Sequence, residues 1–400
     1  MRFTEFEKAL DAASGTGFHA HRNLSNLPLL FIDNIMSKFI IYGAQGIALG
    51  AFRAIKYLYY DVDIICFMIT KKGSDPEEVY NVPVRELDDM SSSLSDTEKA
   101  SVRVLICTPE NVMDEINEGL RLHGFLNIKR MDSMSWAHLM EKAFFHDDFT
   151  SEGAFCPLSI LLENVSVPPV HVYMTKFWKD YKVRTEYSFP DYYIPIQVGA
   201  ALTDKRVADI TDDTGDNISL LNVNYSELTG LYWVWKNVLP LEKDKENVWY
   251  GLAHYRRFLN ISDEDLKRLD KSTVDTILPF PMPYEPDIEA HHRRYLSADD
   301  WDAVICALKE VAPEYASAAP RILKTHWLYN YNIFISRGKI FDDYCNFLFP
   351  VLMRVNELRN PDGRRADRYI GYIAETLNTI YHIYNRNRLR IYHAGCRFLV

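Results

Sequence analysis

The sequence predicts an α/β protein in which a Rossmann-like, doubly wound parallel sheet is followed by a second α/β domain. Apolar runs of strand length alternate with helical patterns between residues 38 and 124, and such alternation is typical of parallel sheets. A second series of apolar runs begins after Pro168 and Pro169 and continues to the carboxyl terminus. We therefore expect a helical lead-in at 1–37, a first domain with its linker at 38–165, and a second domain at 166–400.

Length and composition exclude several classes of protein. The 400 residues are 48% hydrophobic and 25% charged, which is ordinary for a globular chain of two or more domains. The net charge of -10 argues against nucleic acid as a partner, because phosphate binding needs clustered Lys and Arg. The amino terminus lacks a secretory signal and no apolar run reaches the ~20 residues that span a bilayer, so we expect a cytoplasmic location. The six cysteines are widely spaced, which indicates reduced thiols.

The first domain opens with a strand, a glycine turn and a helix, KFIIYGAQGIALGAFRAIKYLYY. Further strands are expected at 63–70 and 102–109, separated by a serine-rich polar loop at 88–99, and a helix follows. The turn offers backbone N–H groups to a phosphate at a helix start, and its candidate nucleotide-binding residues are Gly43, Gln45, Gly46 and Gly50. The alternative is that these glycines only pack the helix against the strand.

The blocks IYGAQGIALG, NVPVRELDDM and VLICTPENVMDEI resemble the nucleotide-sugar-binding front domain of bacterial sugar acetyltransferases. The resemblance implies that the first domain binds a sugar nucleotide or a related ligand, or is a vestigial module. A dinucleotide-binding fold usually has an acidic residue at the end of its second strand, whereas this strand ends in Thr70, Lys71 and Lys72. That difference argues against NAD as the ligand of the first domain.

In the second domain, an unbroken apolar run over 248–253 is followed at once by His254, Arg256 and Arg257. Ligands of open α/β sheets bind beyond the carboxyl ends of the strands, so these side chains are expected at a cleft. Burying unpaired guanidinium groups is costly, and arginine matches the oxygens of phosphate in bidentate fashion. A diphosphate would satisfy the pair. The alternative is an ion pair with the Asp-rich loop at 212–216.

Other polar residues of the second domain have two readings each. The Asp-rich loop is typical of a solvated turn, although its side chains could also contact a ligand. The helix around 224–237 buries one apolar face and leaves Glu227 and Lys236 for other surfaces. Asn332, on an expected strand, could orient a ligand or complete a buried hydrogen-bond network. The candidate ligand-binding residues are Asp212, Asp213, Asp216, Asn217, Glu227, Lys236 and Asn332.

Seven blocks in order extend over 171–400: IPIQVGA, TDDTGDNIS, NYSELTGLYWVWKN, GLAHYRRFL, YNYNIFISR, FDDYCNFLFPVL and RYIGYIAETL. Together they resemble a family of bacterial capsular and surface-polysaccharide glycosyltransferases long described as a domain of unknown function. The resemblance implies a GT-A-like fold and sugar transfer from a nucleotide-sugar donor, expected to be a UDP-sugar. It implies a glycan or lipid-linked glycan acceptor, reached at the inner face of a membrane by peripheral association at most.

The resemblance also raises the question of whether the protein uses a metal ion. Many GT-A enzymes hold a divalent metal with an Asp-x-Asp motif after a buried strand, but the three literal matches, which begin at Asp61, Asp263 and Asp300, do not stand there. We expect Arg256 and Arg257, with His254, to replace that metal, and we assign no metal ligand. The competing hypothesis gives a metal to the Asp-rich loop.

Sugar transfer with inversion needs a base, for which Glu375 is the first candidate. It shares a helix face with Arg368, and its alternative role is an intrahelical ion pair with Arg368 or Arg364. Two rival functions remain at this point. One is an NAD-dependent sugar-nucleotide oxidoreductase or epimerase that acts through the first domain, and the other is a non-catalytic protein that binds sugar nucleotides.

Overall fold

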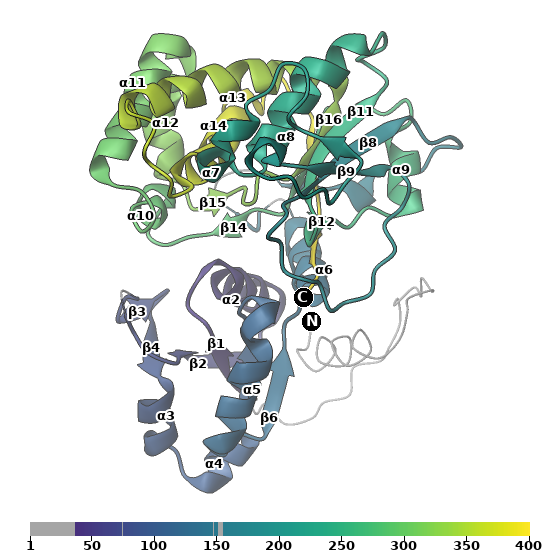
Figure 1. Ribbon diagram of the computed structural model, residues 1–400. Helices are drawn as coiled ribbons and strands as arrows, with labels where there is room; N and C mark the ends of the chain where they lie inside the picture. Colours follow the sequence, from purple (N-terminus) through teal and green to yellow (C-terminus); the bar gives the residue numbers. More distant parts are fainter. Residues whose placement is uncertain (1–36, 74, 147, 151–154) are drawn as a thin grey trace. The chain divides into compact units, whose positions relative to one another are not determined.

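The computed structural model describes residues 37–73, 75–146, 148–150 and 155–400. The chain forms two compact units, Met1–Phe149 and Thr150–Val400 (Figure 1). The expected helical lead-in at 1–37 lies outside the described residues, apart from its last residue. The expected domain boundary near residue 165 differs from this division, because Cys156 and Pro157 form a strand that belongs to the sheet of the second unit.

The first unit has a six-stranded sheet in the order β3-β4-β2-β1-β5-β6, in which every pair is parallel except β3 with β4. The chain builds β2 and β4 on one side of β1 and then crosses to the other side, which is the doubly wound order expected from the sequence. The strands are β1 (Ser37–Tyr42), β2 (Val62–Ile69), β3 (Glu78–Val79), β4 (Val82–Glu86), β5 (Arg103–Ile106) and β6 (Asn127–Arg130).

Five α-helices accompany this sheet in the described part of the first unit: α2 (Gly46–Leu58), α3 (Leu87–Ser93), α4 (Asp96–Ser101), α5 (Met113–Leu122) and α6 (Ser133–Phe144). The serine-rich stretch is therefore not the loop expected from its composition. Ser95 accepts a hydrogen bond from the Glu98 backbone while the Glu98 side chain accepts one from the Ser95 backbone. This capping box begins α4, and it could have been read from the sequence.

The main sheet of the second unit has the order β10-β9-β8-β11-β16-β13-β17-β7. The pairs β10/β9, β9/β8 and β8/β11 are parallel, whereas β16 runs antiparallel to both of its neighbours. The strands are β7 (Cys156–Pro157), β8 (Val170–Lys176), β9 (Tyr193–Gln197), β10 (Ile210–Thr211), β11 (Trp249–His254), β12 (Arg257–Leu259), β13 (Thr276–Pro279), β16 (Phe334–Arg337), β17 (Ile391–Ala394) and β18 (Cys396–Phe398), with β14 (Met282–Pro283) and β15 (Trp327–Leu328) forming a separate ribbon.

The helices of the second unit occupy the connections between these strands (Figure 1). They are α7 (Asn222–Tyr225), α8 (Leu228–Trp233) with a π-helical turn (Val234–Val238), α9 (Asp263–Leu269), α10 (Ile288–His292), α11 (Ala298–Val311), α12 (Pro313–Leu323), α13 (Gly338–Arg359) and α14 (Tyr369–Asn385). Among the described residues, every helix is too short or too polar to span a bilayer. The prediction of a mixed α/β fold with parallel strands is confirmed.

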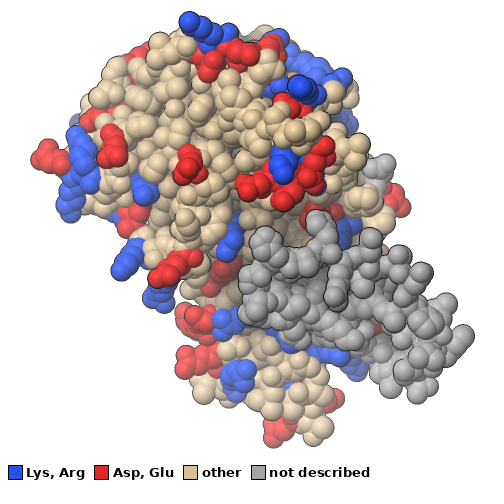
Figure 2. All heavy atoms as spheres, turned by 90° about the vertical axis from the view of Figure 1, so that its right-hand side faces the viewer, with Lys and Arg blue, Asp and Glu red and all other residues tan. Residues whose placement is uncertain are grey.

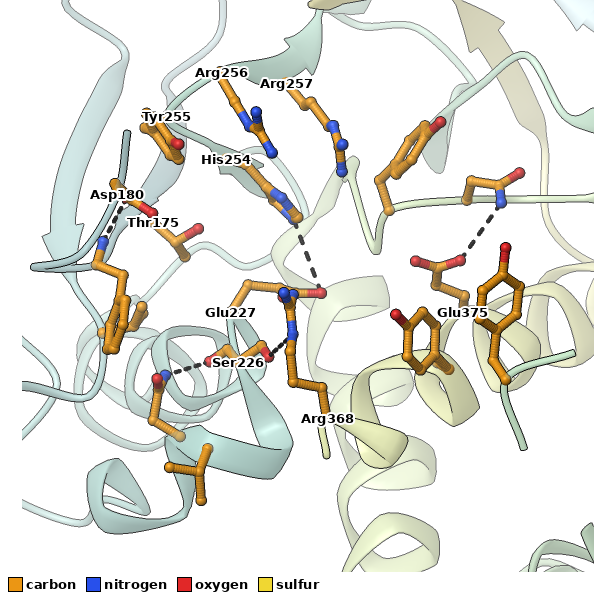
Figure 3. A pocket seen from close by; sticks show the side chains of 18 of the residues that line it. Thr175, Asp180, Ser226, Glu227, His254, Tyr255, Arg256, Arg257, Arg368 and Glu375 are labelled. Atoms are coloured by element: carbon orange, nitrogen blue, oxygen red, sulfur yellow. Dashed lines mark hydrogen bonds and ion pairs between the residues drawn. The ribbon is translucent and has the colours of Figure 1, made fainter. Parts of the chain in front are cut away.

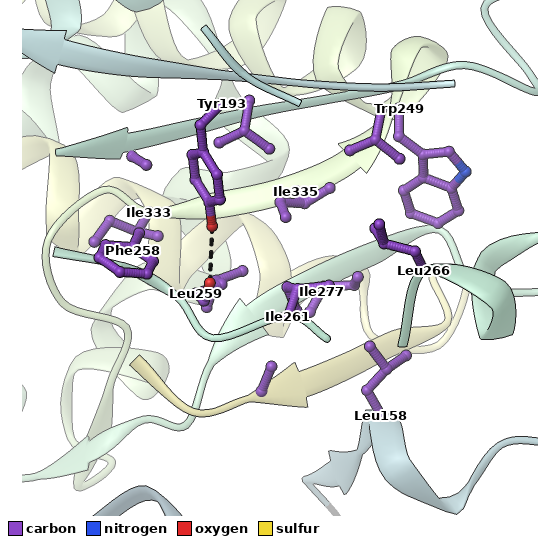
Figure 4. Packing of buried hydrophobic residues seen from close by; sticks show 14 of the residues in the cluster. Leu158, Tyr193, Trp249, Phe258, Leu259, Ile261, Leu266, Ile277, Ile333 and Ile335 are labelled. Atoms are coloured by element: carbon purple, nitrogen blue, oxygen red, sulfur yellow. Dashed lines mark hydrogen bonds between the residues drawn. The ribbon is translucent and has the colours of Figure 1, made fainter. Parts of the chain in front are cut away.

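One face of the second sheet packs on a core of buried aliphatic and aromatic side chains (Figure 4). Trp249 and Ile335, from neighbouring strands, are almost fully buried there, and the Tyr193 hydroxyl donates to the Leu259 carbonyl at 2.8 Å. Gly251 interrupts the apolar run of β11 because the strands approach closely at this point. A Cβ at residue 251 would lie 2.5 Å from the Phe334 carbonyl oxygen.

The surface fits the charge balance read from the sequence. On the face shown in Figure 2, acidic and basic side chains are intermixed over the second unit. None of the six cysteines, all of them described, forms a disulfide, and four of the six are buried.

Candidate functional site

The candidate site lies where the strand order of the second sheet reverses. The parallel strands β8, β9 and β11 end at one edge of the sheet, and the chain places β9 on one side of β8 and β11 on the other. Such a switch point leaves a crevice between the loops that leave the two strands. A cavity of about 780 Å³ opens there, and its walls include the residues that follow β8 and the residues that follow β11.

The end of β11 explains why an apolar strand leads into two arginines. His254 pairs with Arg257 across a tight hairpin, so Tyr255 and Arg256 form the turn and Arg257 begins β12. The Tyr255 N–H donates to the Thr175 carbonyl at 3.1 Å, and the Leu399 N–H donates to the Arg256 carbonyl at 2.8 Å. These backbone bonds fix the turn, and the side chains of His254, Arg256 and Arg257 line the cavity (Figure 3).

The guanidinium groups of Arg256 and Arg257 form no ion pair or hydrogen bond with any residue that the structure describes. The guanidinium carbon of Arg257 lies 4.7 Å from the ring centroid of Tyr331, and that of Arg256 lies 5.8 Å from the ring centroid of Tyr255. The alternative of an ion pair with the Asp-rich loop is therefore not what the structure shows. Two cations at a cavity wall without carboxylate partners can accept an external anion.

Arg368 adds a third guanidinium group to the cavity. It precedes the first residue of α14 with a left-handed φ of 61°, and its Nε donates to the Ser226 hydroxyl at 3.0 Å. Sequence reasoning considered Arg368 only as an alternative intrahelical partner of Glu375 and missed this position. A cation at the start of a helix opposes the helix dipole, and that unfavourable placement is the signal that could have indicated a function.

The loop before Arg368 is held by a buried carboxylate, Asp300, which is 1% exposed. Asp300 accepts hydrogen bonds from both Arg365 and Arg359. Burial alone would raise the pKa of Asp300, but the hydrogen bonds from Arg365, Arg359 and Ser297 hold that pKa well below its usual range. The Asp-x-Asp match at Asp300 is thus a structural anchor.

His254 and Glu227 line the cavity, and Asn332 is linked to them through Glu227. The Glu227 carboxylate accepts from Asn332 Nδ2 at 2.8 Å and lies 3.9 Å from His254 Nε2. Burial lowers the pKa of His254, although the charge of Glu227 opposes that effect, so the ring is neutral. His254 Nε2 is buried without a hydrogen-bond partner in the described chain, and it can therefore bond to a ligand.

Glu375, on α14, also lines the cavity. Burial, and then the charge of Glu227, raises the pKa of Glu375 to about 8. Its Oε2 accepts from Asn330 Nδ2 at 3.5 Å (Figure 3). At neutral pH a carboxyl group with this pKa is mostly protonated, and its ionised form is a stronger base than an ordinary carboxylate.

Backbone strain is concentrated at the same place. Seven described residues other than glycine have a left-handed φ, and such residues each cost about 1–3 kcal/mol unless their surroundings hold them. Ser226, Tyr331 and Arg368 line the cavity, and Asn332 bonds to Glu227. Four of the seven thus belong to one site, which is the distribution expected of a functional site.

The other candidates from the Asp-rich loop and its neighbouring helix do not line this cavity. Asp212 is fully buried and accepts from the Gly199 and Ala200 N–H groups and from the Ser219 hydroxyl. The remaining members make local contacts: Asp213 pairs with Arg206, Asp216 accepts from Tyr232, Asn217 donates to the Gly215 carbonyl, and Lys236 lies over the Trp235 ring. Backbone and side-chain partners explain the loop as a structural turn.

The glycine turn of the first unit has a packing explanation. Gly43 has a left-handed φ of 117°, and a Cβ there would lie 2.6 Å from the Cys107 carbonyl oxygen. Gln45 precedes α2 and donates its side-chain amide to Asp75, Gly46 begins the helix, and Gly50 is buried within it. Nucleotide binding by this turn stays a prediction.

Side chains that could ligate a metal are dispersed in the described part of the chain. In the part of the chain that the structure describes, no three His, Cys, Asp or Glu side chains gather so that they could hold a metal ion. The carboxylates at the cavity are Asp180, Glu227 and Glu375. Asp180 accepts from the Phe177 N–H at 2.7 Å, and burial raises its pKa to about 6.

The fold and the site define an α/β protein with a cation-lined cavity at the switch point of its sheet, a common place for nucleotide ligands. Residues 174–386 match the model of a family described as Domain of unknown function (DUF4422). The match covers more than half of the chain, and the chain belongs to this family.

Comparison with solved structures finds similarity to one titled "WbbM bifunctional glycosyltransferase apo structure", with 27% identity and a TM-score of 0.49. The match covers 57% of this chain and 45% of that one, so it spans less than half of the bifunctional protein. No curated protein matches the chain.

Proposed function

We propose that the chain is a glycosyltransferase that moves a sugar from a nucleotide-sugar donor, expected to be a UDP-sugar, to a capsular or surface polysaccharide acceptor. The observation that carries this proposal is the pair of guanidinium groups, Arg256 and Arg257, that face a cavity without carboxylate partners. Arg368 faces the same cavity. The blocks of sequence that resemble surface-polysaccharide glycosyltransferases support the same activity.

The donor binds across the switch point. Its diphosphate lies between Arg256, Arg257 and Arg368, where several charge-assisted hydrogen bonds are available. The nucleoside extends toward the residues that follow β8, including Thr175 and Phe177, which line the cavity. The transferred sugar then points toward Glu375, which Figure 3 shows on the side of the cavity away from Asp180.

The reaction exchanges one C–O bond for another. An acceptor hydroxyl oxygen forms a bond to the anomeric carbon, and the bond from that carbon to the diphosphate oxygen breaks. The electron pair leaves with the nucleoside diphosphate, whose growing negative charge the guanidinium groups stabilise. The hydroxyl proton passes to the ionised form of Glu375. No divalent metal is required, because the chain's own arginines supply the positive charge.

The test is an assay of the full chain against a panel of UDP- and other nucleotide-sugars, with product nucleoside diphosphate measured in EDTA. We expect slow donor hydrolysis without acceptor and faster turnover when glycan acceptors are added. The double substitution Arg256→Gln with Arg257→Gln should lower turnover at least a hundredfold.

The matched control removes an arginine that lies away from the cavity. Arg354→Gln removes a guanidinium group that pairs with Glu310 and Glu357 and does not line the site, so it should leave turnover unchanged. Turnover that disappears in EDTA and returns with Mn²⁺ would reject the arginine mechanism. Nicotinamide binding without any nucleotide-sugar turnover would favour the oxidoreductase instead.

A further inference from the structure

One end of the cavity carries an aromatic wall formed by Tyr284, His291, Tyr295 and Tyr372. The rings of Tyr295 and Tyr372 stack with centroids 5.0 Å apart and planes 17° from parallel. His291 stacks on Tyr284 with centroids 3.6 Å apart, and it meets the Tyr295 ring edge-on at 5.4 Å. The four rings are thus in contact with one another, from Tyr284 and His291 through Tyr295 to Tyr372 on α14.

We propose that this aromatic wall is the acceptor subsite and that it binds a neutral sugar ring of the acceptor glycan. The inference rests on the proposed glycosyltransferase function, whose donor the guanidinium groups already accommodate. The C–H bonds of a sugar ring carry partial positive charge, and the faces of aromatic rings are negative. The exposed part of the Tyr295 ring therefore suits an uncharged pyranose or furanose.

The wall adjoins the proton acceptor. Tyr372 precedes Glu375 by one turn of α14, so both side chains lie on the same face of that helix. Asn330 connects the two parts, because its Nδ2 donates to the Tyr284 hydroxyl at 3.0 Å and to Glu375 at 3.5 Å. A sugar on the wall would present its hydroxyl next to Glu375.

A second observation indicates a polar ligand here. Asn330 is 7% exposed, it lines the cavity, and its Oδ1 is buried without a hydrogen-bond partner in the described chain. An unsatisfied buried amide oxygen costs about 1–3 kcal/mol. A sugar hydroxyl that donates to this oxygen would remove that cost.

The wall favours neutral sugars over acidic ones. Neither Lys nor Arg belongs to the four-residue wall, and burial lowers the pKa of His291 to about 4, so its ring is uncharged at neutral pH. Burial likewise lowers the pKa of the neighbouring His292 to about 3. The carboxylate of an acidic sugar would find no cation among the four residues of this wall, and the charge of Glu227 at the same cavity would repel it.

Access to the wall is open. Tyr295 is 51% exposed, whereas Tyr284 is buried beneath His291. A glycan can therefore reach the Tyr295 ring from solvent and extend inward. Truncating Tyr295 changes the ligand surface without emptying the core.

The experiment measures ligand binding directly. Saturation-transfer NMR would compare octyl β-galactopyranoside, octyl β-glucopyranoside and octyl β-glucuronide on the full-length protein saturated with UDP. We expect the neutral glycosides to bind more tightly than the glucuronide. Tyr295→Ala should weaken neutral glycoside binding by about three- to tenfold, and Tyr295→Phe should retain it.

The control is Tyr60→Ala, a substitution at an exposed tyrosine of the first unit. Unchanged glycoside binding by Tyr295→Ala, or glucuronide binding as tight as that of the neutral glycosides, would overturn the inference. Because binding is observed without turnover, this failure is distinguishable from failure of the glycosyltransferase proposal, which appears as absent donor hydrolysis.

Discussion

Replacing Glu227 with Gln should make the enzyme more active at neutral pH. Burial and the charge of Glu227 together raise the pKa of Glu375 to about 8. If Glu375 accepts the proton of the acceptor, only the ionised fraction is active. With a pKa of about 8, about one carboxyl in eleven is ionised at pH 7 and about ten in eleven at pH 9. The wild-type kcat/KM should then rise about tenfold between these pH values.

The Glu227→Gln substitution removes the nearby negative charge and keeps an oxygen that can accept from Asn332. A single neighbouring charge changes a pKa by about one pH unit or more, so the midpoint should move to about pH 7. About half of the Glu375 carboxyls would be ionised at pH 7, and kcat/KM there should rise about fivefold.

The assay is kcat/KM against pH, measured with subsaturating donor, because that ratio reports groups of the free enzyme. Glu246→Gln is the matched control, since Glu246 is exposed and pairs with Lys339 outside the cavity. Glu375→Gln should lower kcat/KM by about 10²–10⁴ at every pH. A midpoint that stays in place or moves upward in Glu227→Gln would refute this account of Glu375.

Two further predictions concern the frame of the site, and thermal or urea unfolding measures both. Gly251→Ala should destabilise the second unit by about 1–3 kcal/mol, because the new Cβ would lie 2.5 Å from a backbone oxygen of β16. Gly119→Ala is the control, because the space around Gly119 is open and the substitution should not destabilise the protein. Equal effects of the two substitutions would contradict the packing argument. Asp300→Asn should lower the free energy of unfolding by about 3–5 kcal/mol, because it breaks the buried ion pair with Arg365. Asp299→Asn, at an exposed carboxylate, should lower it far less. An unchanged melting temperature in Asp300→Asn would show that the ion pair does not stabilise the fold.

Local patterns in the sequence were enough to locate the parallel strands and one wall of the cavity. The apolar run of β11 followed by cations was informative, because a buried strand that ends in unpaired charge needs a partner. The structure places Arg256 and Arg257 at a cavity, without an ion pair to any described residue. His254, Glu227 and Glu375 also reach this cavity.

The remainder of the site depended on tertiary structure. Arg368 faces the cavity only because Asp300 holds the preceding loop, a contact over more than 60 positions in sequence. The aromatic wall joins Tyr284 and Tyr295, which flank α10, to Tyr372 on α14, and nothing in the spacing of these residues brings them together. For the Asp-rich loop the sequence suggested ligand-binding residues that do not line the cavity. The Asp212 carboxylate instead accepts hydrogen bonds from backbone N–H groups, which the sequence does not reveal.

The central claim is that guanidinium groups receive the diphosphate of the donor, and calorimetric titration with UDP in EDTA tests it most directly. We predict measurable UDP binding by the wild-type chain, and about ten- to a hundredfold weaker binding by Arg256→Gln or by Arg257→Gln, because each loses a charged hydrogen-bond donor. UDP affinity that is unchanged in both variants, or that depends on added Mn²⁺, would contradict the claim.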